Sequence, residues 1–332
     1  MNWNGEKLLQ QFLPALLQHS PAGTDFYVAD NASTDQSIAV VEQLFPTVKI
    51  IALQKNWGFA AGYNRALEQI DAQYYVLLNS DVEVTEGWIE PIIELLDTNP
   101  TIAACQPKIR SYHRKEEFEY AGAGGGFIDK WCYPFCRGRI FHIFEKDEGQ
   151  YDQVTEIFWA SGASLFIRAD VYHSVGGLDE DFFAHMEEID LCWRIKNMGH
   201  QVFFHPESLV YHVGGGTLLM GTPRKTFLNF RNNLQLMTKN LPKRSFLPLL
   251  GLRMVLDGVA AVSFLPYKNG WGNFWAVFKA HMSYYWLFFH IMKKRKNVPN
   301  RKVGRIYKKS VVFDFFLRKK KKFSELQGEF TK

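Results

Sequence analysis

Three carboxylic acids within four positions of this 332-residue chain, Glu187, Glu188 and Asp190, lie among aromatic and aliphatic residues. These neighbours predict a segment that is at least half buried, and a buried carboxylate needs a partner, a proton or a cation. Such carboxylates are concentrated at functional sites. In a helix running to Gly199, Glu187 and Asp190 would share one face and Glu188 would point elsewhere. An equally supported interpretation is a helix start whose acids complement the helix dipole and pair with Arg194.

A second group of polar residues, Asn79, Ser80 and Asp81, follows the hydrophobic run 76–78. On an extended backbone, residues two apart face the same side, so Asn79 and Asp81 would both point into a crevice. A carboxylate and an amide oxygen suit a hard divalent cation that carries phosphates. A polar turn at the end of a strand is the simpler interpretation of so short a motif.

Asp30 ends another predicted strand, where it could bind a sugar or base hydroxyl, while Thr34 or Asp35 could cap the following helix. Residues 56–64 (NWGFAAGYN) form a glycine-containing entry to a helix, where backbone N–H groups can meet phosphate. The chain lacks a GxGxxG motif at this point and a Walker A motif, so a Rossmann dehydrogenase or P-loop enzyme is disfavoured.

His212 ends a further predicted strand, before three consecutive glycines. A lone histidine is more often structural, but opposite a metal-binding carboxylate it is equally well explained as a ligand. Cys132, Cys136 and His142 have loose spacing and no assigned fourth ligand. They are therefore better explained as structural thiols than as a zinc site.

The elements that must position these residues alternate between helix and strand. The pattern predicts helices at 6–18, 35–44, 59–70 and 86–97, and strands at 24–30, 48–53, 74–79 and 102–109. Helices of this length between strands indicate right-handed crossovers and a mostly parallel sheet. Ligands bind beyond the carboxyl ends of such strands, where Asp30 and 79–81 fall.

The second half of the body is less regular. Residues 111–153 contain a glycine cluster and many aromatics, which predict an ordered and functional flap. After the flap, the pattern predicts strand 154–168, helix 169–175, the acidic segment, strands 201–205 and 208–213, and helix 222–240.

Charge is distributed unevenly along the chain. The net charge is +5, but residues 293–322 carry +13 and the last ten carry −1, which leaves −7 for residues 1–292. A basic tail of this kind is either a solvated end or an anchor for an anionic surface. The four cysteines lack the spacing of a disulfide framework and no signal peptide is evident, which favours a reducing, cytoplasmic location.

Residues 246–292 are rich in Leu, Phe, Trp and Tyr and nearly free of acids. We expect no transmembrane helix, because the run 258–278 is interrupted by Pro266, Lys268 and Gly270, and the uncharged run 280–292 is too short. Amphipathic, aromatic-rich helices before a basic tail favour peripheral attachment to the cytosolic face of a membrane. The alternative is a helical subdomain packed on the core, followed by a solvated tail.

The ordered motifs resemble those of the family 2 glycosyltransferases, and most closely the rhamnosyltransferase-like branch of bacterial surface-polysaccharide synthesis. They are NWNG (2–5), VADNASTD (28–35), NWGFAAGYN (56–64), LLNSDVEV (77–84), SGASLFIR (161–168), GGLDEDFF (176–183), EEIDLCWR (187–194) and VYHVGGGT (210–217). The resemblance implies a GT-A fold with a Rossmann-type sheet, a nucleotide-sugar donor, a divalent metal (Mg²⁺ or Mn²⁺) and inversion at the anomeric carbon.

The resemblance also implies roles for single residues. Asp81 matches the metal-binding aspartate of the DxD motif and His212 the histidine that approaches the metal. Glu188 falls on the expected general base, with Glu187 and Asp190 as further catalytic candidates that position the base or bind acceptor. The implied donor-binding residues are Asn4, Asp30, Asn56, Asn64, Asn79 and Ser80.

This sequence departs from the family pattern at two points. Glu188 replaces the usual aspartate, and the chain begins at NWNG, where family members have a preceding hydrophobic strand. We therefore expect a glycosyltransferase domain at 1–240 that lacks its first strand, an aromatic-rich helical extension at 241–292 and a basic tail at 293–332.

The predicted function is an inverting, metal-dependent transfer of a sugar to a lipid-linked glycan at an anionic membrane, with no nucleic-acid partner. One alternative is a catalytically degenerate, glycosyltransferase-like binding subunit. Another is a metal-dependent nucleotidyltransferase, whose usual glycine- and lysine-rich opening motif is missing from this sequence.

Overall fold

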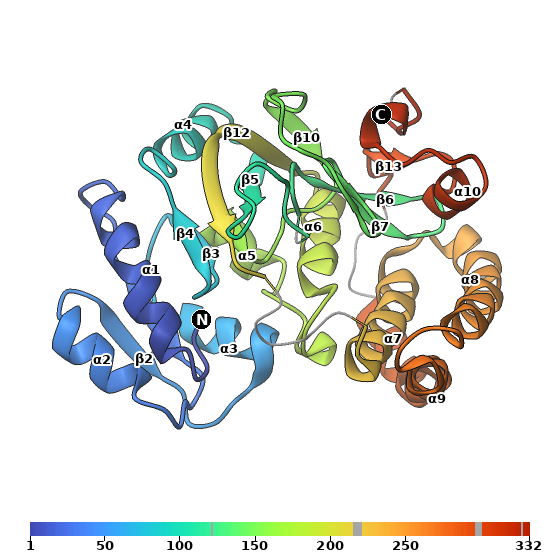
Figure 1. Cartoon of the computed structure of the whole chain (residues 1–332), viewed down its shortest axis with the longest axis horizontal. Helices are drawn as coiled ribbons and strands as arrows, with labels where there is room; N and C mark the ends of the chain where they lie inside the picture. The colour runs from blue at the N-terminus through green and yellow to red at the C-terminus, as the bar shows by residue number, and fades with distance from the viewer. Residues whose placement is uncertain (121, 215–220, 296–300, 327) are drawn as a thin grey trace.

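The computed structural model of the chain describes residues 1–332 except 121, 215–220, 296–300 and 327. Three sheets follow one another across the molecule, from the N-terminal elements at one end to a layer of long helices at the other (Figure 1). The N-terminal end holds a parallel pair of strands, β1 (Tyr27–Asp30) and β2 (Lys49–Ala52), with α1 (Glu6–Gln18), α2 (Ser37–Leu44) and α3 (Gly58–Leu67).

The central sheet has the strand order β10-β12-β5-β11-β3, with β4 paired to β12. Its strands are β3 (Tyr74–Leu78), β4 (Val82–Val84), β5 (Ile102–Ser111), β10 (Thr155–Ile157), β11 (Ser164–Arg168) and β12 (Gln201–His212). Helices α4 (Glu90–Thr98), α5 (Ala169–Ser174) and α6 (Glu187–Met198) join them, with a short 3₁₀ helix, η1 (Glu180–Phe182), before α6.

The prediction of a mostly parallel sheet is wrong. β5 and β12 are parallel, but β11 lies between β5 and β3 and runs antiparallel to both. β11 follows the flap rather than a crossover helix, so the handedness rule for β-helix-β units does not set its direction. The predicted strand 154–168 is likewise two strands, β10 and β11, joined by the turn 158–163.

The described residues of the flap at 111–153 are ordered, as predicted, and form most of the third sheet. Its strands are β6 (Gly126–Asp129), β7 (Pro134–Cys136), β8 (Arg139–Ile140) and β9 (Ile143–Phe144), and β13 (Ile306–Tyr307) pairs in parallel with β6. After β13 come α10 (Val311–Phe316) and η2 (Phe323–Leu326). Asp129 accepts the backbone N–H of Val311 at 2.9 Å, which ties the C-terminal segment to the flap. Residues 306–326 are therefore packed on the protein rather than being a solvated tail.

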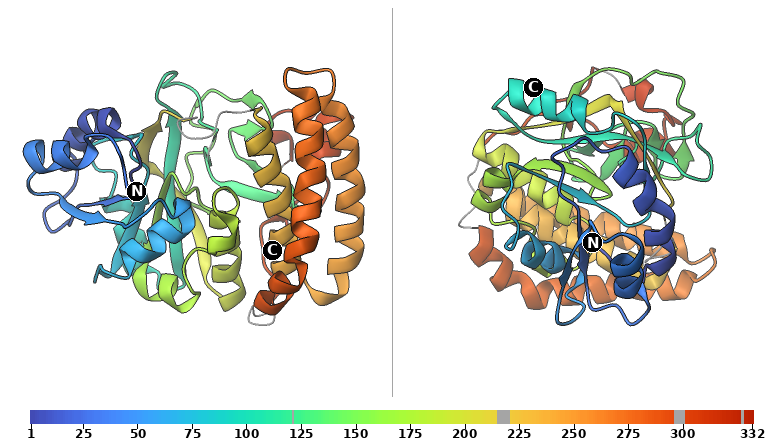
Figure 2. Two further views of the ribbon diagram at one scale, coloured as in Figure 1. Left: turned by 90° about the horizontal axis from the view of Figure 1, so that it is seen from below. Right: turned by 90° about the vertical axis from the view of Figure 1, so that its left-hand side faces the viewer.

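Three long helices close the other end of the molecule: α7 (Pro223–Asn240), α8 (Lys243–Phe264) and α9 (Gly270–Arg295). They lie side by side, with α7 against the body (Figure 2). By length and composition, α8 is the one described helix that could cross a membrane, and 28% of that stretch is buried in the structure. The sequence prediction expected helices in this region but did not recognise a stretch long enough to cross a membrane. It considered runs that begin at 258 and 280, whereas α8 begins at Lys243.

Candidate active site

The turn after β3 brings Asp81 to the end of β12. The backbone N–H of Asn79 donates to the carbonyl of Ala163 at 3.0 Å, and the carbonyl of Asp81 accepts the N–H of Val213 at 3.0 Å. The turn is thereby fixed to the residue before β11 and to the residue after β12. The side chain of Asp81 is held beside His212, as the strand-end positions of both residues predicted.

His212 lies between two carboxylates. Its Nε2 is 3.2 Å from Oδ1 of Asp81, and its Nδ1 is 3.1 Å from Oε2 of Glu119. All three side chains are buried. Hydrogen bonds and charge from both carboxylates outweigh burial and raise the pKa of His212 to about 10, while His212 lowers the pKa of Asp81 despite its burial. The site therefore favours positive charge between its carboxylates.

A divalent cation fits Asp81 and His212. Adjacent ligands of an octahedral ion with bonds of about 2.1 Å lie about 3 Å apart, close to the separation of Oδ1 and Nε2. The ion would replace the proton that the carboxylates hold on the imidazole, since a metal-bound ring nitrogen must be deprotonated. In the described part of the chain, no group of three acidic, histidine or cysteine side chains is placed to hold a metal alone. Further ligands would come from a bound substrate or water.

Glu187 and Glu188 begin α6, with Glu187 buried and Glu188 half-buried. One carboxylate oxygen of each has no hydrogen-bond partner among the described residues. Burial and the neighbouring Glu188 raise the pKa of Glu187 well above its usual value. Burial also raises the pKa of Glu188, to about 7, although backbone amides at the start of α6 oppose the shift. The surroundings of Glu187 therefore favour its protonated form, while Glu188 can gain and lose a proton near neutral pH.

Glu188 faces the turn that supports the Asp81 site. A Cβ placed on Gly162 would lie 3.8 Å from the Cβ of Glu188 and 3.2 Å from the ring of Phe59. The next residue, Ala163, accepts the hydrogen bond from Asn79 described above. The start of α6 therefore packs against the segment 162–163, and this segment is hydrogen-bonded to the turn that carries Asp81.

The segment before α6 has an unusual backbone. Phe183, His185 and Met186 have φ values of 63°, 69° and 74°, in the left-handed region that side chains other than glycine rarely occupy. Such conformations persist where the surrounding structure enforces them, and they cluster at active sites. This strained segment sets the direction in which α6, and with it Glu188, begins.

Asn232 of α7 holds the strained segment in place. Its Nδ2 donates to the carbonyls of Phe182, Ala184 and His185 at 2.9, 2.9 and 2.7 Å. The side chain is completely buried, so no water can replace it. Neighbouring Arg231 donates to the carbonyl of Phe182 at 3.1 Å. An asparagine from the C-terminal helices thus fixes the segment that carries the candidate base.

We expect Asn232→Ala to lower kcat about 10-fold and the free energy of unfolding by about 2 kcal/mol, since it leaves buried carbonyls unpaired. Loosening the segment would also admit water to Glu188, so the acidic limb of the kcat–pH profile should move below pH 7. Asn233→Ala is the matched control. Asn233 is also buried and donates to the carbonyl of Cys132 at 2.8 Å, away from the segment. It should lose stability without moving the profile, and equal profiles for both variants would contradict the assignment.

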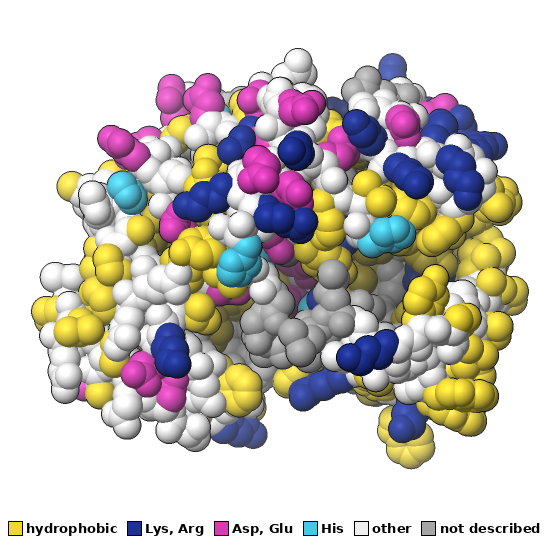
Figure 3. Space-filling model, in the orientation of Figure 1, with side chains coloured by type: hydrophobic (Ala, Val, Ile, Leu, Met, Phe, Trp, Pro, Cys, Tyr) yellow, Lys and Arg dark blue, Asp and Glu magenta, His cyan; other side chains and the backbone are white. Residues whose placement is uncertain are grey.

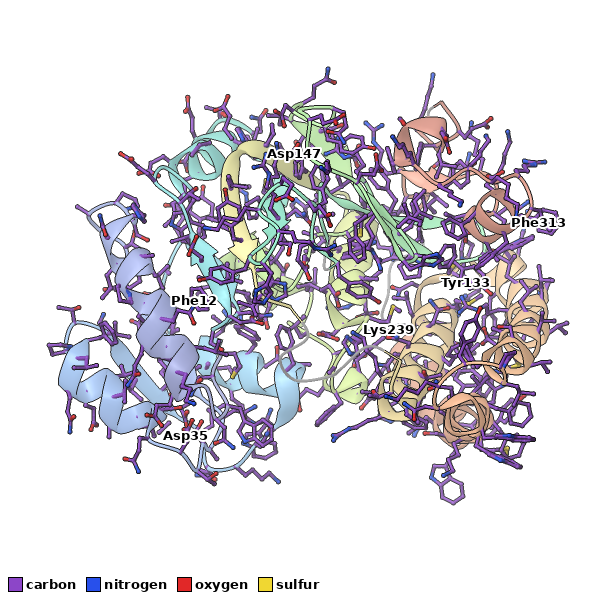
Figure 4. The ribbon with its side chains drawn as sticks, viewed as in Figure 1. Phe12, Asp35, Tyr133, Asp147, Lys239 and Phe313 are labelled. Atoms are coloured by element: carbon purple, nitrogen blue, oxygen red, sulfur yellow. The ribbon has the colours of Figure 1, made fainter. Side chains whose placement is uncertain are left out.

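Asp190, a catalytic candidate from the sequence, is fully buried and fully paired. It accepts from Arg194 Nε at 2.7 Å, Lys239 Nζ at 2.8 Å and Asn240 Nδ2 at 2.8 Å. Lys239, which lies between α6 and α7 (Figure 4), also bonds Asp179 at 2.7 Å. These cations keep the pKa of Asp190 below its usual value in spite of burial. Asp190 therefore joins α6 to α7, and the predicted pairing with Arg194 is present.

The predicted donor-binding residues fall into two groups. Asp30 is buried and accepts from Asn2, from Ser33 N–H at 2.9 Å and from Ser33 Oγ, and Asn4 accepts the N–H of Thr34 at 2.7 Å. These residues form a hydrogen-bonded group at the carboxyl end of β1, which we call the Asp30 wall. Asn79 and Ser80 lie in the turn that carries Asp81.

The two asparagines that flank the entry to α3 have structural partners. Asn56 Oδ1 accepts from Asn31 and from Gly58 N–H. Asn64 Oδ1 accepts from Leu178 N–H and the Tyr172 hydroxyl, and its Nδ2 donates to the Leu178 carbonyl. The polar atoms of Asn64 are thus engaged with the loop before η1. Asn56 shapes the entry loop next to the Asp30 wall.

The sequence did not single out Glu119, His185, Asn232 or Lys239. Burial and the nearby charge of Lys225 lower the pKa of His185 to about 4, so its ring is neutral, and its buried Nε2 has no partner among the described residues. A run of three polar residues within α7, 231–233, was a readable signal for Asn232. Glu119 lies in the irregular flap, where no periodicity marks the side that faces His212.

Cys132 and Cys136 are buried in the core, in agreement with the preference for structural thiols.

Known proteins resemble this chain in sequence. A family model described as Glycosyl transferase family 2 matches residues 2–172. The chain is 26% identical over 220 residues to the N-acetylglucosaminyl-diphospho-decaprenol L-rhamnosyltransferase of Mycobacterium tuberculosis, which covers 61% of this chain and 71% of that protein.

Two solved structures are similar in fold. GalNAc-T7 with UDP, GalNAc and Mn²⁺ has a TM-score of 0.57 at 13% identity, over 90% of this chain and 56% of that one. The mannosyltransferase PcManGT from Pyrobaculum calidifontis, in complex with GDP-Man and Mn²⁺, has a TM-score of 0.52 at 14% identity, over 86% of this chain and 85% of that one. The present chain thus spans little more than half the length of the GalNAc-T7 chain.

Proposed function

This chain belongs to glycosyl transferase family 2, and from that membership we propose that it transfers a sugar, with inversion, from a nucleotide-sugar to a hydroxyl of a lipid-linked glycan. It is a glycosyltransferase with an α/β, GT-A-like fold and a nucleotide-sugar donor. We propose, in addition, that the anomeric configuration is inverted, that a divalent metal is required and that the acceptor is lipid-linked.

One observation supports the proposal above the others. The Glu188 carboxyl group has an unpartnered oxygen and a pKa of about 7, and Glu188 packs beside Gly162, next to the residue that is hydrogen-bonded to the turn carrying Asp81. A single displacement at an anomeric carbon requires a base at the acceptor hydroxyl and a cation at the leaving diphosphate, the roles that Glu188 and the Asp81–His212 pair would supply. The acceptor oxygen bonds to that carbon, the bond to the donor diphosphate breaks, and the acceptor proton passes to Glu188.

Each side chain has a separate part in this scheme. Asp81 and His212 would hold Mn²⁺ or Mg²⁺, which when bound neutralises charge on the leaving diphosphate. Asp30 would face the nucleoside from the wall beyond β1. Glu188, ionised above its pKa, would orient the acceptor hydroxyl and take its proton. Glu187, whose pKa is raised by burial and by Glu188, would favour its neutral form and so limit the negative charge next to the base.

The acceptor is inferred from the mycobacterial relative, whose name specifies a sugar on a diphospho-decaprenol lipid. We infer that this chain also acts on a sugar joined through a diphosphate to a polyprenyl lipid. The cytosolic face of a membrane would be its place of work, because nucleotide-sugars are soluble whereas such an acceptor stays in the bilayer.

A transfer assay tests the function directly. The chain is incubated with Mn²⁺, a panel of UDP-, dTDP- and GDP-sugars, and a short-chain polyprenyl diphosphate that carries N-acetylglucosamine. We expect release of nucleoside diphosphate from one donor, in proportion to the acceptor consumed and dependent on the metal. Thermal stabilisation by a donor, without transfer or hydrolysis for any pair, would instead support the binding subunit and overturn the proposal.

A further inference from the structure

The outer side of α9 carries a continuous stripe of exposed apolar residues. Trp286 is 89% exposed and Phe289 is 78% exposed, values unusual for aromatic side chains in a folded protein. The stripe consists of Trp271, Trp275, Phe278, Met282, Tyr285, Trp286 and Phe289. Apart from the adjacent Tyr285 and Trp286, successive members are three or four residues apart, which places them on one face of the helix.

The stripe is widened by two neighbouring elements. α8 exposes Leu252, Val255, Val259 and Val262, again at spacings of three and four. α10 exposes Phe313, Phe316 and Leu317 at the same end of the molecule, where Phe313 points outward (Figure 4). We call this combined surface the apolar end face. Yellow side chains mark it along the right-hand edge of the space-filling view (Figure 3).

Every exposed charge on α8, α9 and the loop between them is positive. Asp257 is the only acid among residues 243–295, and it is fully buried and paired with Arg253 at 2.7 Å. The exposed charged residues are Lys243, Arg244, Lys268, Lys279 and Lys293. Beyond α10 follows the basic run 318–322, and Lys and Arg side chains gather beside the yellow edge in Figure 3.

We propose that the apolar end face docks on an anionic lipid bilayer, with α8 and α9 lying in the plane of the interface. Exposed Trp and Tyr rings are typical of the membrane–water boundary, and surrounding lysines match anionic headgroups. A second copy of the chain is a poorer occupant. A two-fold symmetric contact would bring the same unneutralised lysines of both copies together.

The buried side of α8 argues for lying on the membrane rather than crossing it. Arg253 donates to Asn233 of α7 at 2.7 Å and to Asp257 at 2.7 Å, and Asp257 lies 3.2 Å from His281 of α9. This polar layer fixes α8 along its length to helices that pack on the body. In a spanning helix the same groups would enter the hydrocarbon, where charged side chains are unfavourable.

The inner side of α9 reaches the loop before the candidate base. Lys294 bonds Asp179 at 2.5 Å and Asp181 at 2.6 Å, and His290 bonds Asp181 at 2.8 Å. The helix that faces the bilayer on one side therefore touches the segment leading to Glu188 on the other. If the proposed function holds, this arrangement connects the docked helix to the loop that leads to the reaction site.

Vesicle binding by the full chain tests the docking. We expect it to sediment with vesicles that contain about one third phosphatidylglycerol, and at least 10-fold more weakly with pure phosphatidylcholine. The triple variant Trp271→Ser, Trp286→Ser, Phe289→Ser should bind the anionic vesicles at least 10-fold more weakly with an unchanged circular dichroism spectrum. Leu44→Ser with Val154→Ser is the matched control, because both side chains are exposed (58% and 43%) away from this face.

Two results would overturn the proposal. Unchanged binding of the triple variant to anionic vesicles would show that another surface, such as the basic run 318–322, makes the contact. Failure of the chain to bind either vesicle, together with a dimer in analytical ultracentrifugation that the triple variant abolishes, would assign the face to a second copy. Neither measurement uses donor or acceptor, so a failure here leaves the proposed transfer reaction untouched.

Discussion

Replacing Glu188 with glutamine is expected to lower kcat at least about 100-fold while KM for the donor stays within a factor of three. Glutamine keeps the shape of the side chain but cannot accept the acceptor proton, and general bases contribute about 100- to 10,000-fold. Initial rates of nucleoside diphosphate release with saturating acceptor measure the effect. Glu86→Gln, a surface change on the loop before α4, should be silent.

The pH dependence and the stability of Glu188→Gln supply independent readouts. Glu188 works in its ionised form, so kcat of the unmodified chain should fall as the pH drops below about 7. Because folding raises the pKa of Glu188, ionisation of this group destabilises the fold as the pH rises through that value. Above pH 7 the glutamine variant should therefore melt at the same or a higher temperature. Loss of activity together with a lowered melting temperature would indicate a damaged fold instead.

Glu187→Gln distinguishes the roles of the two neighbouring acids, Glu187 and Glu188. Burial and the neighbouring Glu188 favour the protonated form of Glu187, and an amide resembles a neutral carboxyl group in size and polarity. Its replacement should therefore cost less than 10-fold in kcat, far less than the change at Glu188. A larger loss at 187 than at 188 would transfer the role of base to Glu187.

Asp81→Asn is expected to reduce transfer at least about 100-fold and to weaken Mn²⁺ binding, measured by the paramagnetic resonance signal of free Mn²⁺ in the presence of donor. The amide removes a negative charge from the cation site and leaves His212 with Glu119 as its one carboxylate neighbour among those described here. With a single carboxylate partner, the pKa of His212 should fall, which proton NMR of the imidazole can follow. Charge neutralisation of the diphosphate would be lost with the metal.

Asp71→Asn serves as the control for Asp81, because Asp71 is exposed near the opposite end of β3. It should leave activity, metal binding and the His212 resonance unchanged. Full activity of Asp81→Asn with undiminished Mn²⁺ binding would show that the cation, if one is needed, binds elsewhere.

Local patterns in the sequence were sufficient to predict the parts of the site that lie at the ends of elements. The polar turn at 79–81 and His212 each follow a hydrophobic run, and the structure brings Asp81 and His212 within 3.2 Å. Helical spacing also predicted that Glu188 would point away from Asp190, and the two do have different surroundings. Gly199 ends α6 in a left-handed conformation, as expected of a glycine at that place.

Other features depend on contacts between distant segments, for which no local pattern exists. Asn232 and Lys239 reach the strained segment and Asp190 from about 50 residues away. The direction of β11 follows from the path of the flap, which propensity does not encode. Charge counts left the basic tail as either a solvated end or an anchor for an anionic surface, but they did not reveal that Tyr307, Phe315 and Phe323 between its lysines are buried against the flap.

The strand pairing between β13 and β6 also constrains the order in which the protein can be assembled. The hydrogen bond from Val311 to Asp129 closes a loop of 182 residues, and the ribosome makes about 5–20 residues per second. For on the order of ten seconds or more, a nascent chain carries its flap without the edge strand and the aromatic rings that later cover it. During that interval the flap is a hydrophobic surface open to chaperones and to wrong partners. Assembly of the flap side of the active site is therefore one of the last events in the synthesis of this protein.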